Sequence, residues 1–109
     1  MDFSDYQERS RATAVYPNAG ENLLYPTLGL CGETGEVAEK IKKMVRDEGG
    51  VLSDERREAL SQEMGDVLWY LAQLATEARL DLGDIAEANI AKLRSRQRSD
   101  RLHGSGDDR

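Results

Sequence analysis

The sequence of 109 residues predicts a single all-α domain, in which four helices form a bundle-type fold. Three observations support this prediction. Apolar residues recur at spacings of three and four, the period of an amphipathic helix. β-Branched and aromatic residues are sparse, and the aromatics make up only 6% of the chain. Proline and glycine separate four segments of helical length.

The first two helices have clear boundary signals. A helix is expected over residues 5–16, where Ser4 is the N-cap and Pro17 disfavours helical backbone in the residue before it. A second helix is expected over residues 26–48, because proline suits the first turn of a helix. The glycine pair at 49–50 supplies the left-handed backbone that ends helices.

The second half of the chain predicts two more helices. Ser53 caps a helix over residues 54–79, where acidic residues in the first turn suit the helix dipole. The last helix is expected over residues 83–98. We therefore assign a helical domain to residues 1–101 and a Gly-rich C-terminal tail to residues 102–109.

Charge and cysteine content exclude several classes of protein. The chain has 15 Lys+Arg and 21 Asp+Glu, a net charge of −6, which argues against binding a nucleic acid polymer. Most of the acid lies in residues 1–91, whereas residues 92–109 are basic. The longest uncharged stretch, residues 22–32, is too short to cross a bilayer, so no membrane partner is expected. The lone Cys31 excludes an internal disulfide and favours a cytoplasmic location.

One acidic pattern occurs twice, thirty residues apart. Residues Glu33-Thr34-Gly35-Glu36-Val37 correspond to Glu63-Met64-Gly65-Asp66-Val67. At about 100° per residue, the acidic pair of each helix borders the apolar stripe, whose members fall roughly 20–80° to one side of the first acid. Two helices that pack by these stripes would bring four carboxylates into one partly sheltered place.

Such a cluster is costly unless a cation neutralises it, since like charges repel and burial disfavours ionisation. Mg²⁺, or alternatively Mn²⁺, prefers such oxygen ligands, so the pattern predicts a metal site at Glu33, Glu36, Glu63 and Asp66. The alternative is that these acids face solvent on ordinary charged helices. Glu39 lies away from the stripe and is either a surface acid or a ligand of a second cation.

This pattern resembles that of the MazG-like, all-α nucleotide pyrophosphohydrolases. The similarity lies in Glu-x-x-Glu on one helix and Glu-x-x-Asp on the next, in the wording of residues 32–39 and 65–71, and in Asn89-x-x-Lys92-Leu93. These motifs occur in the family's order at compatible spacing, and the resemblance covers nearly the whole chain. The last residues, 103–109, also resemble the ending of a small, single-domain branch.

The resemblance implies Mg²⁺-dependent hydrolysis of nucleoside or deoxynucleoside triphosphates to monophosphate and pyrophosphate. The removal of aberrant nucleotides is the cellular task that such an activity suggests. The four repeated acids match the metal ligands, and Glu36 or Glu39 would orient or deprotonate the attacking water. Asn89 and Lys92 match positions that approach the phosphates or sugar, Arg96 is a further basic contact, and the tail with Arg109 would close over the substrate. The MazG-like fold is further expected to assemble as a homodimer or homotetramer.

Other interpretations remain open. The activity could be restricted to a pyrimidine deoxynucleotide such as dUTP or dCTP, or the chain could be a non-enzymatic helical module whose acids bind a basic partner. The basic residues from Lys92 onward could simply complement the C-terminal end of a helix dipole. Trp69 falls away from the apolar stripe and is expected to contact a partner helix or a second subunit.

Overall fold

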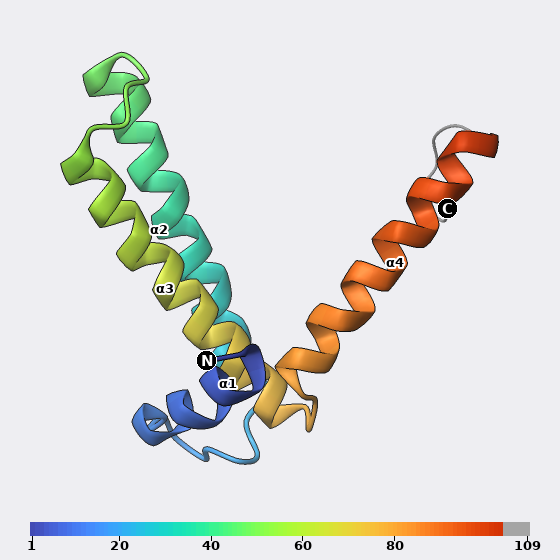
Figure 1. The fold of residues 1–109 in the computed structure, drawn as a ribbon. Coiled ribbons are helices and arrows are strands. Elements are labelled where there is room, and N and C mark those ends of the chain that lie inside the picture. The colour runs from blue at the N-terminus through green and yellow to red at the C-terminus, as the bar shows by residue number, and fades with distance from the viewer. Residues whose placement is uncertain (104–109) are drawn as a thin grey trace.

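The computed structural model describes residues 1–103, with side chains to residue 100, and these residues form helices without any strand. The predicted all-α class and the number of α-helices are confirmed. The elements are α1 (Phe3–Ser10), the 3₁₀-helix η1 (Arg11–Thr13), α2 (Leu24–Glu48), α3 (Asp54–Glu77) and α4 (Leu82–His103). Figure 1 shows α2 and α3 side by side as an antiparallel pair, α1 at the foot of this pair, and α4 leading away from it. No helix in this part of the chain is long and apolar enough to cross a membrane.

The four helices do not close into a bundle within one chain, which differs from the sequence-based prediction. α2 packs along α3, whereas α4 packs mainly against α1 and diverges from the α2–α3 pair (Figure 1). The radius of gyration is accordingly 17.2 Å, against about 13 Å for a compact domain of this length. The physical reason is that α4 is rich in charged residues and offers little apolar surface for packing. Its apolar residues Ile90 and Leu93 stay about half-exposed in the described part of the chain.

The α2–α3 connection follows the predicted boundaries closely. Gly49 ends α2 with a φ of 62°, in the left-handed region that glycine tolerates best. Ser53 caps α3, its side chain accepting a hydrogen bond from the backbone N–H of Arg56. α2 begins two residues earlier than expected, at Leu24, and α3 ends two residues earlier than expected, at Glu77.

The first helix differs from its prediction at both ends. Asp2 is the N-cap in place of Ser4, and it forms a reciprocal capping box with Asp5. Ser4 instead donates a hydrogen bond to Asp81 beside the start of α4. The α-helix ends at Ser10, six residues earlier than expected, because the chain then tightens into η1 and a loop that binds the end of α3.

That loop is held by the buried carboxylate of Glu77, which the sequence did not single out. Its side chain accepts hydrogen bonds from the Tyr16 hydroxyl, the Arg11 guanidinium and the backbone N–H groups of Gly20 and Asn22. Burial raises the pKa of this carboxyl, but the four donors outweigh burial and lower it to about 2. Glu77 therefore fixes residues 14–23 on α3 as a charged, fully hydrogen-bonded anchor.

The core is small and lies at the foot of the molecule. Its buried apolar residues are Tyr16, Ala72, Ala75 and Leu82, next to the completely buried amide of Gln73. A second amide, Gln7, donates to the Thr76 hydroxyl and the Leu80 carbonyl and accepts from the backbone of Leu82. These contacts tie α1 to the turn between α3 and α4, and so set the direction in which α4 leaves.

Candidate functional site

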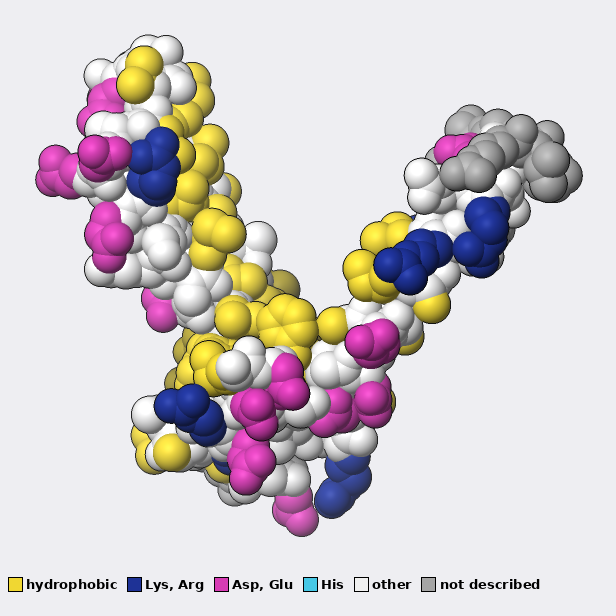
Figure 2. Space-filling view, in the orientation of Figure 1, with side chains coloured by type: hydrophobic (Ala, Val, Ile, Leu, Met, Phe, Trp, Pro, Cys, Tyr) yellow, Lys and Arg dark blue, Asp and Glu magenta, His cyan; other side chains and the backbone are white. Residues whose placement is uncertain are grey.

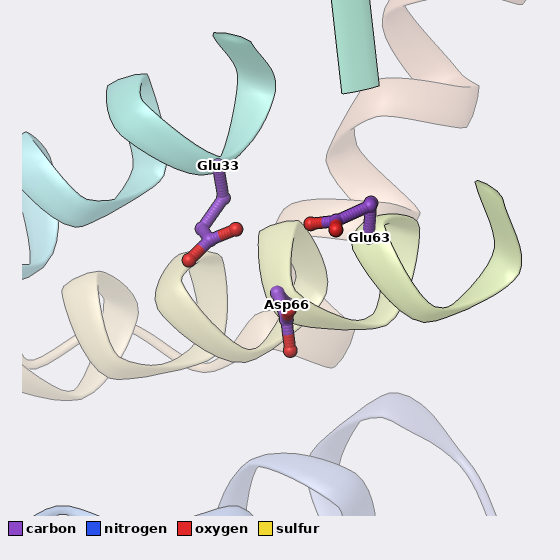
Figure 3. A group of neighbouring side chains, drawn as sticks. All are labelled: Glu33, Glu63 and Asp66. Carbon is purple, nitrogen blue, oxygen red and sulfur yellow. The ribbon is translucent and has the colours of Figure 1, made fainter. Parts of the chain in front are cut away.

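Three of the four predicted metal ligands meet where α2 faces α3. One carboxylate oxygen from each of Glu33, Glu63 and Asp66 lies within 4.8 Å of the other two. Figure 3 shows that Glu33 comes from α2, whereas Glu63 and Asp66 come from α3. Glu33 and Glu63 are half-buried and Asp66 is exposed, so the cluster is sheltered on one side and open to solvent on the other.

The helix pairing explains why these acids converge. Gly29 on α2 lies against the ring of Tyr70 on α3, so closely that a Cβ at position 29 would overlap the ring. One helical turn further along this antiparallel pair, Glu33 meets Asp66. The missing side chain at Gly29 therefore allows α2 and α3 to pack closely. Gly35 and Gly65, inside the acidic motifs, have open space where a Cβ would point and do not serve packing within the chain.

The acids of the cluster repel one another, and this repulsion acts most strongly on Glu33. Burial raises the pKa of Glu33, and the negative charges of Asp66, Glu63 and Glu36 raise it further. Three carboxylates with this mutual repulsion are the donor set that a hard divalent cation satisfies. Glu33, Glu63 and Asp66 therefore fit such an ion.

Two further acids of α2, Glu36 and Glu39, lie outside the group of three. Glu36 is exposed and does not join the group of three, although its charge contributes to the raised pKa of Glu33. Glu39 is paired with Lys42 at 2.6 Å, and the hydrogen bond from this lysine lowers the pKa of the Glu39 carboxyl. A water-activating role therefore suits Glu36 better than Glu39, which is already held by a cation.

Lys40, which the sequence-based prediction did not include in the site, lies beside the cluster. The Lys40 ammonium nitrogen lies 4.0 Å from the Glu63 carboxylate, and 31% of the lysine side chain is exposed. Its sequence signal was available, since Lys40 is seven residues, or about two turns, beyond Glu33 and shares its face of α2.

An aromatic cavity adjoins the acids on the opposite side from Lys40. It has a volume of about 340 Å³ and is lined by Glu33, Asp66, Thr13, Trp69 and Tyr70. The Trp69 indole N–H donates to the Thr13 hydroxyl at 2.8 Å, and its ring meets Tyr70 edge-on with centroids 5.0 Å apart. Trp69 thus contacts another helix of its own chain, η1, while a contact with a second subunit stays a prediction. A larger hollow of about 640 Å³, between α1 and the end of α3, does not include the clustered acids.

The predicted phosphate contacts do not lie at the acids within one chain. Asn89 and Lys92 are exposed and Arg96 is half-buried on α4, which diverges from the α2–α3 pair that carries the acids (Figure 1). Arg109 and the rest of the tail from residue 104 lie outside the described residues.

Comparison with known proteins identifies relatives that match the helical part of the chain. The family model of the MazG nucleotide pyrophosphohydrolase domain matches residues 23–99, which contain every residue of the acid cluster. The gene 37 protein of Mycobacterium phage L5 is 46% identical over 109 residues, covering 95% of this chain and 96% of that protein.

Two mammalian enzymes are also similar. The dCTP pyrophosphatase 1 of Bos taurus is 36% identical over 78 residues and that of Homo sapiens is 36% identical over 91 residues, covering 70% and 72% of this chain. The matches cover 44% and 54% of those enzymes, so the chain spans about half of their length. No solved structure matches the chain.

Proposed function

This chain belongs to the MazG nucleotide pyrophosphohydrolase family, and from that premise we propose that it hydrolyses nucleoside or deoxynucleoside triphosphates to monophosphate and pyrophosphate in a Mg²⁺-dependent reaction. The observation that carries the proposal is the convergence of Glu33, Glu63 and Asp66 from two facing helices. Family membership supports a nucleotide substrate and the cleavage of a pyrophosphate bond. The raised pKa of Glu33 supports a cation in the cluster.

The acidic side chains have two roles in the proposed reaction, cation binding and proton transfer. When bound, Mg²⁺ or Mn²⁺ would shield the phosphate charge and favour ionisation of water. Glu33, Glu63 and Asp66 would hold that cation, and Glu36 lies one turn from Glu33 at the exposed edge. Glu36 accepts the proton of the attacking water. The water oxygen bonds to the α-phosphorus, the bond from this phosphorus to the bridging oxygen breaks, and that oxygen leaves with pyrophosphate.

The aromatic cavity supports a position for the base. Trp69 and Tyr70 line this cavity together with Glu33 and Asp66, and aromatic rings can stack on a nucleobase. We place the base in this cavity, so that the α-phosphate reaches the acids. The two dCTP pyrophosphatases among the relatives make a pyrimidine deoxynucleotide, dCTP or dUTP, the second candidate substrate.

The exposed apolar surface supports assembly with further copies of the chain. α2 carries a second apolar stripe that no element in the described part of the chain covers, including Leu24, Leu28 and Val45 with exposures of 59–66%. Figure 2 shows hydrophobic side chains along the α2–α3 arm on the side that faces α4. We propose a homodimer or homotetramer in which a second copy covers this stripe.

Such an assembly would also give the α4 residues a role. The cations of α4 have the opposite charge to the α2–α3 acids, and α4 diverges from α2 of its own chain (Figure 1). The α4 helix of a second copy could therefore bring Asn89, Lys92 and Arg96 to the phosphates of a substrate at the acids, with Arg109 following in the tail. A cytoplasmic location is part of the same proposal, because the substrate would come from a pool of free nucleotides.

A panel of triphosphates tests the proposed activity. Canonical and modified nucleotides, including dCTP and dUTP, are incubated with the protein and Mg²⁺, and the products are separated by chromatography. Monophosphate plus pyrophosphate is the expected result. Diphosphate plus phosphate, or no turnover with any nucleotide, would contradict the proposal.

A further inference from the structure

We propose that Lys40 is a phosphate-binding residue that holds the pyrophosphate end of the substrate, an inference that rests on the function proposed above. Lys40 is the cation that contacts the acid cluster in the described part of the chain, 4.0 Å from Glu63. The other ion pairs of α2 and α3 join acids outside the cluster.

The order of residues along the helix pair gives the substrate a direction. In the antiparallel α2–α3 pair, Tyr70 lies opposite Gly29, then Asp66 meets Glu33, and then Glu63 meets Lys40. The aromatic cavity is therefore at one end of the acid cluster and the ammonium group at the other. A nucleoside triphosphate has its base at one end and its terminal phosphates at the other. With its base against Trp69 and Tyr70, it would direct its terminal phosphates toward Lys40.

Charge balance supports the same role. Without a bound cation, the Lys40 ammonium has the Glu63 carboxylate as its partner. When Glu63 binds a divalent cation, its charge no longer neutralises Lys40. The Lys40 ammonium would then lie beside a positive charge that repels it, unless another anion binds there. The β- and γ-phosphates supply that anion, and a charge-assisted hydrogen bond to them is stronger than a neutral one. Lys40 is one-third exposed, so its ammonium can turn from Glu63 to a phosphate without unfolding α2.

Calorimetric titration with magnesium pyrophosphate tests this inference directly. Replacing Lys40→Met, which keeps the aliphatic stem, is expected to weaken pyrophosphate binding about tenfold or more, as the loss of one charge-assisted hydrogen bond predicts. Lys40→Arg should restore most of the affinity. Lys42→Met is the matched control, since Lys42 is paired with Glu39 outside the cluster, and it should bind like the wild type.

Two further titrations distinguish phosphate binding from a structural role. A nucleoside monophosphate with Mg²⁺, and Mg²⁺ alone, should bind the Lys40→Met variant as well as they bind the wild type. Equal weakening of all three ligands would show that Lys40 merely holds Glu63, and would overturn the inference. Unchanged pyrophosphate affinity would overturn it too, while continued hydrolysis would leave the proposed function standing. Absence of hydrolysis by the wild type would instead reject the proposed function.

Discussion

Tyr70 on α3 lies with its ring directly against the backbone of Gly29 on α2, and this contact sets the register that brings Glu33 to Asp66. The ring occupies the space that a Cβ at position 29 would need. The acid cluster thus depends on a residue with no side chain, one turn away from the first acid.

Gly29→Ala is expected to destabilise the protein by about 1–3 kcal/mol, because the new methyl group must displace the Tyr70 ring. This range is the net effect, because alanine favours the helix over glycine by only about 1 kcal/mol and the steric cost is larger. Gly32→Ala is the control, since nothing lies within 4 Å of a Cβ at position 32, and it should stabilise α2 slightly. Urea denaturation of both variants measures the difference, and equal stability would argue against the contact.

Glu33→Gln is expected to abolish activity and to raise the melting temperature of the metal-free protein. The pKa of Glu33 is raised in the folded state, so ionisation of this carboxyl at neutral pH costs folding free energy that a neutral amide does not. Mg²⁺ should then stabilise the wild type but not the variant. Melting curves with Mg²⁺ and with a chelator check both effects.

The control for this variant is Glu58→Gln, which removes an exposed acid of α3 outside the cluster. It should leave both activity and the Mg²⁺ effect on melting unchanged. If Mg²⁺ has no effect on the melting of the wild type, the cluster is not a cation site.

Because of Glu77, the free energy of unfolding is expected to fall as the pH is lowered into the acid range. Its folded-state pKa is about 2, below the ordinary value of 4.5, so its contribution is complete above pH 4.5 and is lost as the pH falls toward 2. Glu77→Gln should destabilise the protein at pH 7 by roughly 2–3 kcal/mol, because it removes the negative charge and turns one of the two accepting oxygens into an amide group that faces donors. Denaturation across pH 2–7 should show a shallower acid slope for the variant, and an unchanged slope would reject the assignment.

Trp69 offers a direct optical test of the base position, because it is the only tryptophan of the chain. A nucleoside triphosphate bound in the aromatic cavity should change the Trp69 fluorescence, since the base stacks beside the indole. Pyrophosphate with Mg²⁺ should have much less effect, as it lacks a base. Equal responses to both ligands would place the base elsewhere.

Assembly can be tested on the exposed α2 stripe. Leu28→Glu is expected to lower the mass in sedimentation equilibrium from two or four times 12.2 kDa toward a single copy, because a charge cannot be buried cheaply in an apolar contact. Val15→Glu is the matched control, as Val15 is 90% exposed in the loop before α2. A wild type that sediments as a single chain would contradict the proposed assembly.

The sequence by itself determined the two long helices α2 and α3 and the acids that they carry. Helical periodicity, the Gly49 and Ser53 boundaries and the repeated acidic motif are local patterns, and α2, α3 and the residues of the cluster follow from them. The spacing of one turn within a helix fixes which face carries the acids, whatever the helix later packs against.

Only the tertiary structure decided which charges meet. The pairing of Lys40 with Glu63, the cage of donors around Glu77 and the contact of Trp69 with Thr13 join residues far apart in the chain, and no local pattern encodes them. The path of α4 is likewise set by Gln7 and the turn that it binds. Periodicity gives the angle of a side chain about its own helix, but the partner of that side chain depends on how two helices are placed in space.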